Sequence, residues 1–208
     1  MTLDVLGLLA ACSYALDCVE AELVHVTNNH SKRVAYMSVC IAKQMGIQEE
    51  SLQDLAVCAL LHDNALTQYI QEELHNDISQ IAVTQEVPKL GAHCIWGEKN
   101  VAELPFHTDV SDVILYHHEN ADGSGPFGKK WDEIPLFSRI IHLCDLLDIA
   151  CRTKKIAEGT WKVAEQFVQN STGTMFDREC SDAFLRAFSE EQFLSLDRET
   201  FEDQLWKM

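Results

Sequence analysis

The chain has 208 residues, of which 47% are hydrophobic and 24% charged, a composition typical of a folded globular protein rather than a disordered segment. Its 16 basic and 33 acidic residues give a formal net charge of −17, which excludes a duplex nucleic-acid binder, because that function requires clustered positive charge. No apolar run is long enough to span a membrane, and no linker-like segment divides the sequence, so we expect one domain over residues 1–208 without a membrane partner.

The N-terminal part of the sequence is predicted to form three helices. Apolar residues at three- and four-residue spacing predict an N-terminal helix within residues 1–24 and a second helix from His30 to Gly46, where the glycine is a natural C-cap. Ser51 and Asp54 resemble a capping box that opens the third helix.

The pair His62-Asp63 is expected at the C-terminal end of that third helix, where a core helix meets a loop. A less regular stretch follows to Val87. Pro88 can then start a helix that carries His93 toward Leu104, since proline is tolerated in the first turn of a helix.

The C-terminal half is also predicted to be helical. An apolar stripe over 110–117 predicts a helix that ends in a turn at 122–128, where glycines and a proline exclude continued helix. A strongly apolar run from Pro135 to Ile149 predicts a core helix with Asp145 well inside it. Shorter helices are expected at 159–170, 177–188 and 197–206. Without strand alternation or an internal repeat, the predicted class is all-α, a single-domain helical bundle.

The cysteines indicate a reducing compartment. None of the eight forms a CxxC pair, and Cys40, Cys58 and Cys144 fall on apolar faces of predicted helices, where a thiol behaves as a small hydrophobe. The opening segment up to Cys12 has no Lys or Arg to supply the positive region of a signal peptide. We therefore expect a cytoplasmic protein.

A scattered set of imidazoles and carboxylates predicts a metal site. Adjacent histidines before a glycine-rich turn rarely arise for packing, and a carboxylate inside the apolar helix around Asp145 is costly without a nearby cation. Such groups hold transition metals while leaving positions open for water and phosphate oxygens. The candidate ligands are His30, His62, Asp63, His93, His117, His118 and Asp145. The remaining histidines are expected to be ordinary surface or helix-end residues: His25, His75, His107 and His142.

The order of these motifs resembles that of the HD-GYP proteins, a branch of the HD superfamily of metal-dependent phosphohydrolases. The likeness covers roughly residues 25–190 and leaves an N-terminal helix at 1–24 and a C-terminal helix at 191–208. The matching segments are His30-Ser-Lys-Arg33, Leu61-His62-Asp63, His93 with Gly97, His117-His118-Glu119, Asp122-Gly-Ser-Gly125, Pro135 with Arg139, and Cys144-Asp145 with Asp148.

The resemblance implies a helical bundle of HD-domain type with a two-metal site in its core, often loaded with iron or manganese. It implies that Asp63 is the catalytic carboxylate and bridges the two metals. The residues implied around the first metal are His30, His62, Asp63 and Asp145, and those around the second are His93, His117 and His118.

The substrates that the resemblance implies are cyclic dinucleotides, chiefly cyclic di-GMP, attacked by water that two cations activate. Lys154 and Lys155 fall where the family places basic residues for substrate phosphate, and a solvated helix end is the alternative interpretation of this pair. Arg139 is expected to support the ligand-bearing helix. A homodimer and a signalling partner protein both remain open.

Three positions depart from the family pattern. The usual His-Asp-x-Gly-Lys ends here in Leu66, which removes a lysine expected to contact phosphate, and the namesake Gly-Tyr-Pro reads Gly125-Pro126-Phe127, which removes a hydroxyl. Val26 stands where some relatives carry glutamate, so no third metal is expected. We therefore expect a cyclic dinucleotide phosphodiesterase with weakened activity. The alternative is a catalytically degenerate member that binds metal and a nucleotide or a partner protein.

Overall fold

The computed structural model describes residues 13–18, 29–72, 87–152 and 160–197, together with residues 201 and 205. The prediction of an all-α class is confirmed: the only strand-like pairings in these residues are two isolated bridges, Asp122 with Lys130 and Thr172 with Phe176. The described helices are α2 (His30–Gln44), α3 (Glu49–Leu60), α4 (Leu66–Glu72), α5 (Val87–Val101), η2 (Trp131–Glu133), α6 (Leu136–Arg152), α7 (Thr160–Ser171), α8 (Arg178–Ala187) and α9 (Glu190–Ser195).

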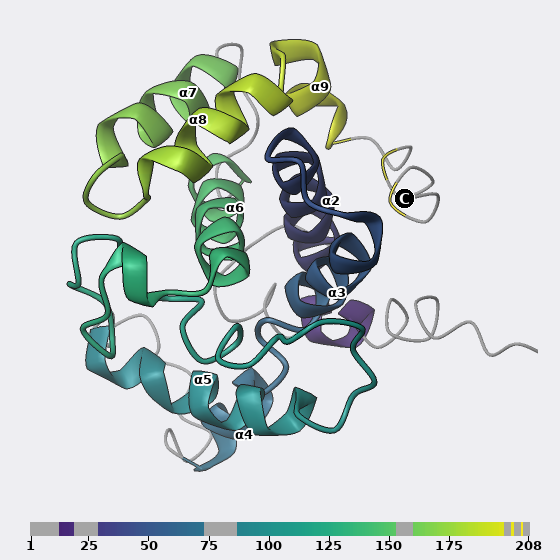
Figure 1. Cartoon of the computed structure of the whole chain (residues 1–208), viewed down its shortest axis with the longest axis vertical. Helices are drawn as coiled ribbons and strands as arrows, with labels where there is room; N and C mark the ends of the chain where they lie inside the picture. The colour runs from purple at the N-terminus through teal and green to yellow at the C-terminus, as the bar shows by residue number, and fades with distance from the viewer. Residues whose placement is uncertain are drawn as a thin grey trace, which may run out of the picture.

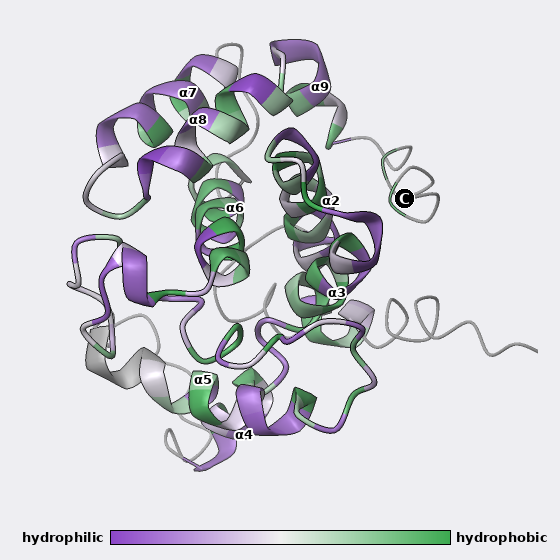
Figure 2. Cartoon of the chain, viewed as in Figure 1, coloured by the Kyte–Doolittle hydropathy of each residue, from purple (hydrophilic) through white to green (hydrophobic). Residues whose placement is uncertain are grey.

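Helix α2 organises the bundle, since it contacts α3, α6 and α8 (Figure 1). Helices α4 and α5 pack together at one end, and α7, α8 and α9 lie at the other (Figure 1). Figure 2 shows many apolar residues along α2, α3 and α6, whereas polar residues are frequent in α7 and α8. Residues such as Ile41, Leu55, Ile141 and Phe184 are fully buried, and each such side chain stabilises the fold by about 1.5–3 kcal/mol.

The predicted end of α2 is confirmed. Gly46 has a φ of 77°, the left-handed conformation that a residue without Cβ adopts most easily, and its amide donates to the Lys43 carbonyl at 3.1 Å. At the other end of α2, His30 and Arg33 lie on the first turn, and both are buried in the core.

The predicted capping box at Ser51 and Asp54 is wrong. Helix α3 begins at Glu49 with Gln48 as its N-cap. The Asp54 carboxylate is buried and instead accepts hydrogen bonds from the amides of His107 and Thr108. Asp54 therefore binds the loop after α5 instead of capping the start of α3.

The predicted helix at 110–117 is also wrong, because residues 111–118 form a series of turns. Asp112 has a φ of 66°, which interrupts any right-handed helix. The Glu98 carboxylate on α5 accepts hydrogen bonds from the amides of Asp112, Ile114 and Leu115. Those bonds replace the ones that a helix would have made and attach this segment to α5.

The later helices match their predicted positions: the bounds of α7 and α8 lie within one residue of those expected, whereas α6 ends three residues beyond the expected Ile149. Of the predicted 1–24 helix, residues 13–18 are described and are helical. Most of the predicted helix at 197–206 lies outside the described residues, and α9 lies just before it. Across the described part of the chain, no helix is both long and apolar enough to cross a lipid bilayer.

Candidate metal centre

All seven candidate ligands lie at one place in the core. His30 comes from the first turn of α2, His62 and Asp63 from the turns after α3, His93 from α5 and Asp145 from the middle of α6. The turns at 111–118 supply His117 and His118. Residues from five segments of the chain therefore meet at one place.

The first ligand group consists of His30, His62 and Asp145, whose ligand atoms all lie within 4.8 Å of one another. The Asp145 Oδ1 atom is 3.2 Å from His30 Nε2 and 3.9 Å from His62 Nε2. Asp145 is only 2% exposed, although it lies in an apolar helix. A cation among these three side chains would offset the cost of burying that carboxylate.

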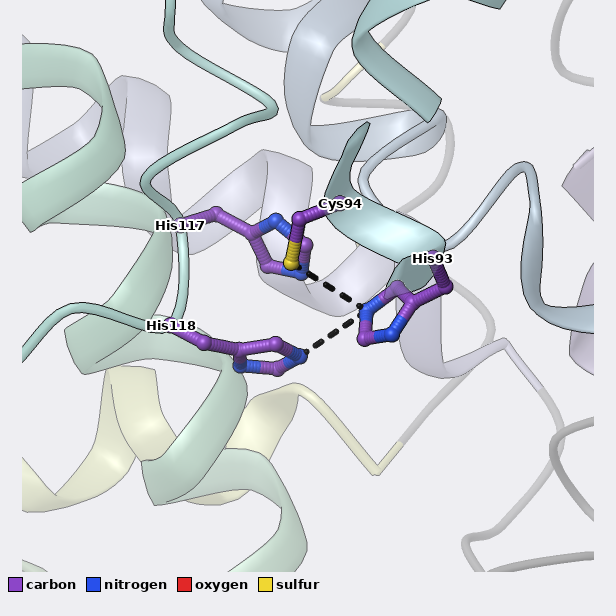
Figure 3. A group of neighbouring side chains, drawn as sticks. All are labelled: His93, Cys94, His117 and His118. Carbon is purple, nitrogen blue, oxygen red and sulfur yellow. Dashed lines mark hydrogen bonds between the residues drawn. The ribbon is translucent and has the colours of Figure 1, made fainter. Parts of the chain in front are cut away.

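The second ligand group consists of His93, Cys94, His117 and His118, whose ligand atoms also lie within 4.8 Å of one another. The Nε2 atoms of His93 and His118 are 3.1 Å apart. Figure 3 shows the His93 and Cys94 side chains reaching from α5 toward the two histidines of the turn segment. Three imidazoles and a thiol thus surround one point.

Asp63 lies between the two groups. Its Oδ1 atom is 3.3 Å from His93 Nε2 and 3.4 Å from His117 Nε2, and its Oδ2 atom is 3.7 Å from His62 Nε2. One carboxylate therefore directs one oxygen toward each ligand group. This is the placement that a bridging ligand requires.

The imidazoles of His62 and His117 are fixed by their backbone contacts. His62 Nδ1 donates to the Ala59 carbonyl at 2.9 Å, and His117 Nδ1 donates to the Ile114 carbonyl at 2.6 Å. The tautomer with a proton on Nδ1 leaves the Nε2 lone pair available. Both Nε2 atoms are buried and make no hydrogen bond in the described structure, which fits residues that hold a metal ion.

His30 is oriented by a buried ion-pair network. Its Nδ1 atom is 2.8 Å from Asp148 Oδ2, and Asp148 also accepts hydrogen bonds from Arg33 Nε and Nη2 at 2.8 Å each. A carboxylate behind an imidazole fixes the ring and makes its other nitrogen a stronger ligand. Arg33 and Asp148 therefore join α2 to α6 next to the first group.

Burial and crowding set the electrostatics of the centre. Burial lowers the pKa of His62, and burial with the neighbouring His117 and His93 holds the pKa of His118 well below its usual value. Burial favours the neutral form of Asp63, but the surrounding imidazoles outweigh it and hold the pKa of this carboxyl well below its usual range. Although burial lowers the pKa of His93 and His117, Asp63 and Cys94 outweigh it and raise the pKa of His93 to about 9 and that of His117 well above its usual value. Metal binding requires neutral imidazoles and an ionised carboxylate, so it would displace protons from these two histidines.

Cys94 was not predicted as part of the site. Burial raises the pKa of the Cys94 thiol, but the neighbouring imidazoles of His117 and His93 outweigh burial and lower this pKa to about 7. The signal available in the sequence was its position directly after His93, but the sequence does not show which way a helical side chain points.

His142 was expected to be an ordinary residue, and it is instead a buried neighbour of the centre. Its Nδ1 atom is 3.0 Å from the His117 carbonyl oxygen, and its Nε2 atom is 3.0 Å from Asn120 Oδ1. Burial lowers the pKa of His142 to about 4. His142 supports the segment that carries the paired histidines, whereas His107 is exposed as expected.

The turn at 122–128 is confirmed and is held by Glu119. The Glu119 carboxylate accepts hydrogen bonds from the amides of Phe127 and Lys129. A Cβ atom at Gly125 would lie 2.6 Å from Glu119 Oε1, so glycine is required there. Phe127 packs edge-on against Tyr116, with ring centroids 5.7 Å apart.

Leu66, which replaces the expected lysine, packs with Tyr69, Ile70, Ala92 and Trp96 in a small apolar cluster between α4 and α5.

Arg139 pairs with the N-cap of α8, since its Nη1 atom is 3.5 Å from Asp177 Oδ2, and so connects α6 with α8. The predicted substrate residues Lys154 and Lys155 lie outside the described residues, as do His25, Val26 and His75.

Comparisons with known proteins agree with the predicted resemblance. The sequence model described as HD domain matches residues 16–180. The chain is 28% identical over 166 residues to the "Cyclic di-GMP phosphodiesterase response regulator RpfG" of Xanthomonas campestris, with 77% of this chain and 43% of that protein covered. It is 32% identical over 174 residues to the "3'3'-cGAMP-specific phosphodiesterase 3" of Vibrio cholerae, with 78% of this chain and 35% of that protein covered. The chain thus spans less than half the length of these relatives.

Two solved structures share the fold. One is a cyclic GMP-AMP specific phosphodiesterase of V. cholerae, which superposes with a TM-score of 0.74 at 21% identity over 95% of this chain and 53% of the other. The second is Bd1817, an HDG"Y"P protein of Bdellovibrio bacteriovorus, which superposes with a TM-score of 0.54 at 18% identity over 74% of this chain and 50% of the other. The predicted likeness to HD-GYP proteins is confirmed, and so is the helical fold of HD-domain type.

Proposed function

Because the chain belongs to the HD domain family, we propose that it is a metal-dependent phosphodiesterase that hydrolyses a cyclic dinucleotide, with cyclic di-GMP as the first substrate to test. The observation that carries this proposal is the position of Asp63, which directs one carboxylate oxygen toward each of two ligand groups. Relatives that share about three quarters of this chain are named as cyclic di-GMP or cGAMP phosphodiesterases, which supports the substrate class.

The ligand groups fit two divalent transition-metal ions, for which we propose iron or manganese. His30, His62 and Asp145 would hold one ion, and the second group would hold the other, with Asp63 shared between them. Two such ions supply Lewis acidity toward phosphoryl oxygens and acidify water near neutral pH. Of the residues in the centre, Asp63 is the one that we propose as catalytic.

The chain's own residues provide the fixed geometry for this chemistry. The backbone contacts of His62 and His117 and the Asp148 contact of His30 fix three imidazoles before substrate arrives. Preorganised ligands of this kind avoid a reorganisation cost during the reaction. With a net charge of −17, the protein as a whole repels an anionic substrate, so attraction must come from the centre itself.

Lys154 and Lys155 are proposed to contact substrate phosphate, just beyond the described end of α6. Leu66 supplies no charge, so we propose that turnover is slower than in relatives with a lysine at this position. We also propose a cytoplasmic setting, because none of the cysteines in the described residues is paired in a disulfide.

A second candidate function is binding without turnover. It is favoured by the apolar packing of Leu66 and by Phe127, which packs against Tyr116 and brings no hydroxyl to the turn. In this alternative, the centre binds metal and a nucleotide, and the complex acts through a partner protein.

The test is an assay of metal-loaded protein with cyclic di-GMP, 3',3'-cGAMP and a linear dinucleotide, with Asp63→Asn as the control. The proposal expects ring opening of at least one cyclic dinucleotide by the wild-type protein and loss of that activity in the variant. Binding of cyclic di-GMP without any product would instead support the second candidate.

A further inference from the structure

Cys94 differs from the other buried cysteines of the described structure. Cys58, Cys144, Cys151 and Cys180 belong to the main hydrophobic core, whereas Cys94 is fully buried but belongs to neither apolar cluster. Its neighbours are imidazoles: its Sγ atom is 3.7 Å from His93 Nε2 and lies within 4.8 Å of the ligand atoms of His117 and His118. Packing as a small hydrophobe therefore does not account for this thiol.

We propose that Cys94 is a ligand of the second metal ion, so that this ion is bound by three imidazoles and a thiolate in addition to the shared oxygen of Asp63. The inference rests on the proposed function, because it assumes that the centre holds metal. It adds a sulfur ligand to an ion for which the sequence predicted only nitrogen and carboxylate ligands. The thiol releases its proton to solvent when the metal–sulfur bond forms, and no redox step is involved.

The distances agree with a shared ion. Bonds of about 2.0–2.1 Å to nitrogen and about 2.3 Å to sulfur, at angles of about 90–110°, put sulfur about 3.1–3.6 Å from a nitrogen and two nitrogens about 2.9–3.4 Å apart. The Sγ atom of Cys94 is 3.7 Å from His93 Nε2, and His93 Nε2 is 3.1 Å from His118 Nε2. Figure 3 shows the four side chains converging on one point.

A second observation points to a ligand at this place. His117 Nε2 is completely buried, is directed into the same group and makes no hydrogen bond in the described structure. A buried nitrogen in this state is costly unless an ion or another group binds it. The thiol and this imidazole therefore share a position that a cation would complete.

A thiolate ligand has a consequence for metal choice. Soft sulfur ligands favour zinc and iron over manganese, whereas oxygen and nitrogen ligands discriminate less. The first group contains only His30, His62 and Asp145, so the preference applies to one of the two ions. The protein is then expected to retain one zinc or iron ion firmly when it is challenged with excess manganese.

X-ray absorption spectroscopy of the 208-residue chain loaded with zinc tests the assignment without any substitution. The expected spectrum contains a sulfur scatterer at about 2.3 Å, in addition to nitrogen and oxygen at about 2.0–2.2 Å. Averaged over two ions, the sulfur occupancy should be about half an atom per zinc. A wild-type spectrum with two bound zinc ions and no sulfur would overturn the proposal.

Cys94→Ser identifies the source of the sulfur. The variant should lose the sulfur signal and bind one of its zinc ions at least about tenfold more weakly, since even supporting groups around a metal contribute that much to affinity. Cys40→Ser is the matched control, because Cys40 is a half-buried thiol on α2 that contacts Tyr36, and it should leave the spectrum unchanged. Sulfur that persists in Cys94→Ser would also overturn the assignment.

The outcomes separate this proposal from the proposed function. Two zinc ions without sulfur would contradict ligation by Cys94 and leave the two-metal centre intact. Protein that binds no metal would contradict both proposals. Sulfur ligation without hydrolysis of any cyclic dinucleotide would support the role of Cys94 and contradict the phosphodiesterase.

Discussion

Asp63 Oδ1 lies 3.3 Å from His93 Nε2, although Asp63 follows α3 and His93 lies on α5. The other oxygen of Asp63 faces His62, its neighbour in the sequence, at 3.7 Å from Nε2. The contact joins the two halves of the centre through a single carboxylate. Removing that carboxylate should therefore affect both ions.

Asp63→Ala should release both metals, because each ligand group loses the oxygen that it shares with the other. The metal content of purified protein, measured by elemental analysis, is expected to fall from about two ions per chain to near zero. His107→Ala is the matched control, since His107 is an exposed histidine on a loop and should retain the full metal content. Equal retention in the two variants would show that the ligands are wrongly assigned.

Chelation should abolish binding of cyclic di-GMP. Without the cations, the centre offers two carboxylates to an anionic ligand within a protein of net charge −17. Calorimetry on stripped protein is expected to show no measurable heat of binding, and adding metal back should restore it. Undiminished affinity in the stripped protein would rule out a contact between metal and phosphate.

Leu66→Lys should raise turnover of the cyclic dinucleotide. The lysine stem can occupy the apolar surface beside Tyr69 and Trp96, and its ammonium can then extend toward the negative charge that develops on the phosphoryl group and the leaving sugar oxygen. We expect a gain of about tenfold or more in kcat with a smaller change in KM. Leu66→Met, which keeps the apolar contact without a charge, should show no gain.

If Leu66→Lys keeps its metals but shows no gain, the lost lysine is not the limiting defect. Inserting tyrosine between Gly125 and Pro126 in the same variant would then test the second departure from the family pattern. A double variant that holds two metals and still leaves cyclic di-GMP intact would favour the binding function.

His142 should make the metal-free protein less stable in acid. Burial lowers its pKa from 6.5 to about 4, so between these values the unfolded chain binds a proton that the folded chain does not. The stability that His142 contributes is complete above pH 6.5 and is lost as the pH falls toward about 4. The loss can reach about 3 kcal/mol, because one pKa unit corresponds to about 1.4 kcal/mol.

Urea unfolding of wild type and His142→Gln in the presence of a chelator measures this effect. The difference between their free energies of unfolding should change in this pH range, since glutamine cannot take up the proton. A difference that stays constant from pH 7 to about pH 4 would show that His142 is not the group responsible.

Much of the fold could be predicted because the periodicity of α2 and α6 reflects a core that these helices share. The motif order also indicated which histidines and aspartates lie together, and the structure brings all seven to one place. The segment at 111–118 could not be predicted from its apolar stripe. Its conformation depends on Glu98, a residue more than a dozen positions away that accepts three of its amide hydrogen bonds.

Two neighbours of the centre could not be found by residue type alone. Cys94 looks like any other apolar-face cysteine in a helix, and its direction is settled by how α5 packs against the paired histidines. His142 lies one turn before Asp145, yet its role depends on a contact with the carbonyl of His117, which lies 25 positions away in the sequence. In both cases tertiary contacts, rather than local pattern, decide what the side chain does.

A crystal structure of the metal-loaded protein, with anomalous scattering to locate the ions, tests the central claim most directly. The account predicts two cations about 3.5–4 Å apart, with one oxygen of Asp63 on each. The predicted neighbours of one ion are His30, His62 and Asp145, and those of the other are His93, His117 and His118. A single cation, or two cations that Asp63 does not join, would contradict it.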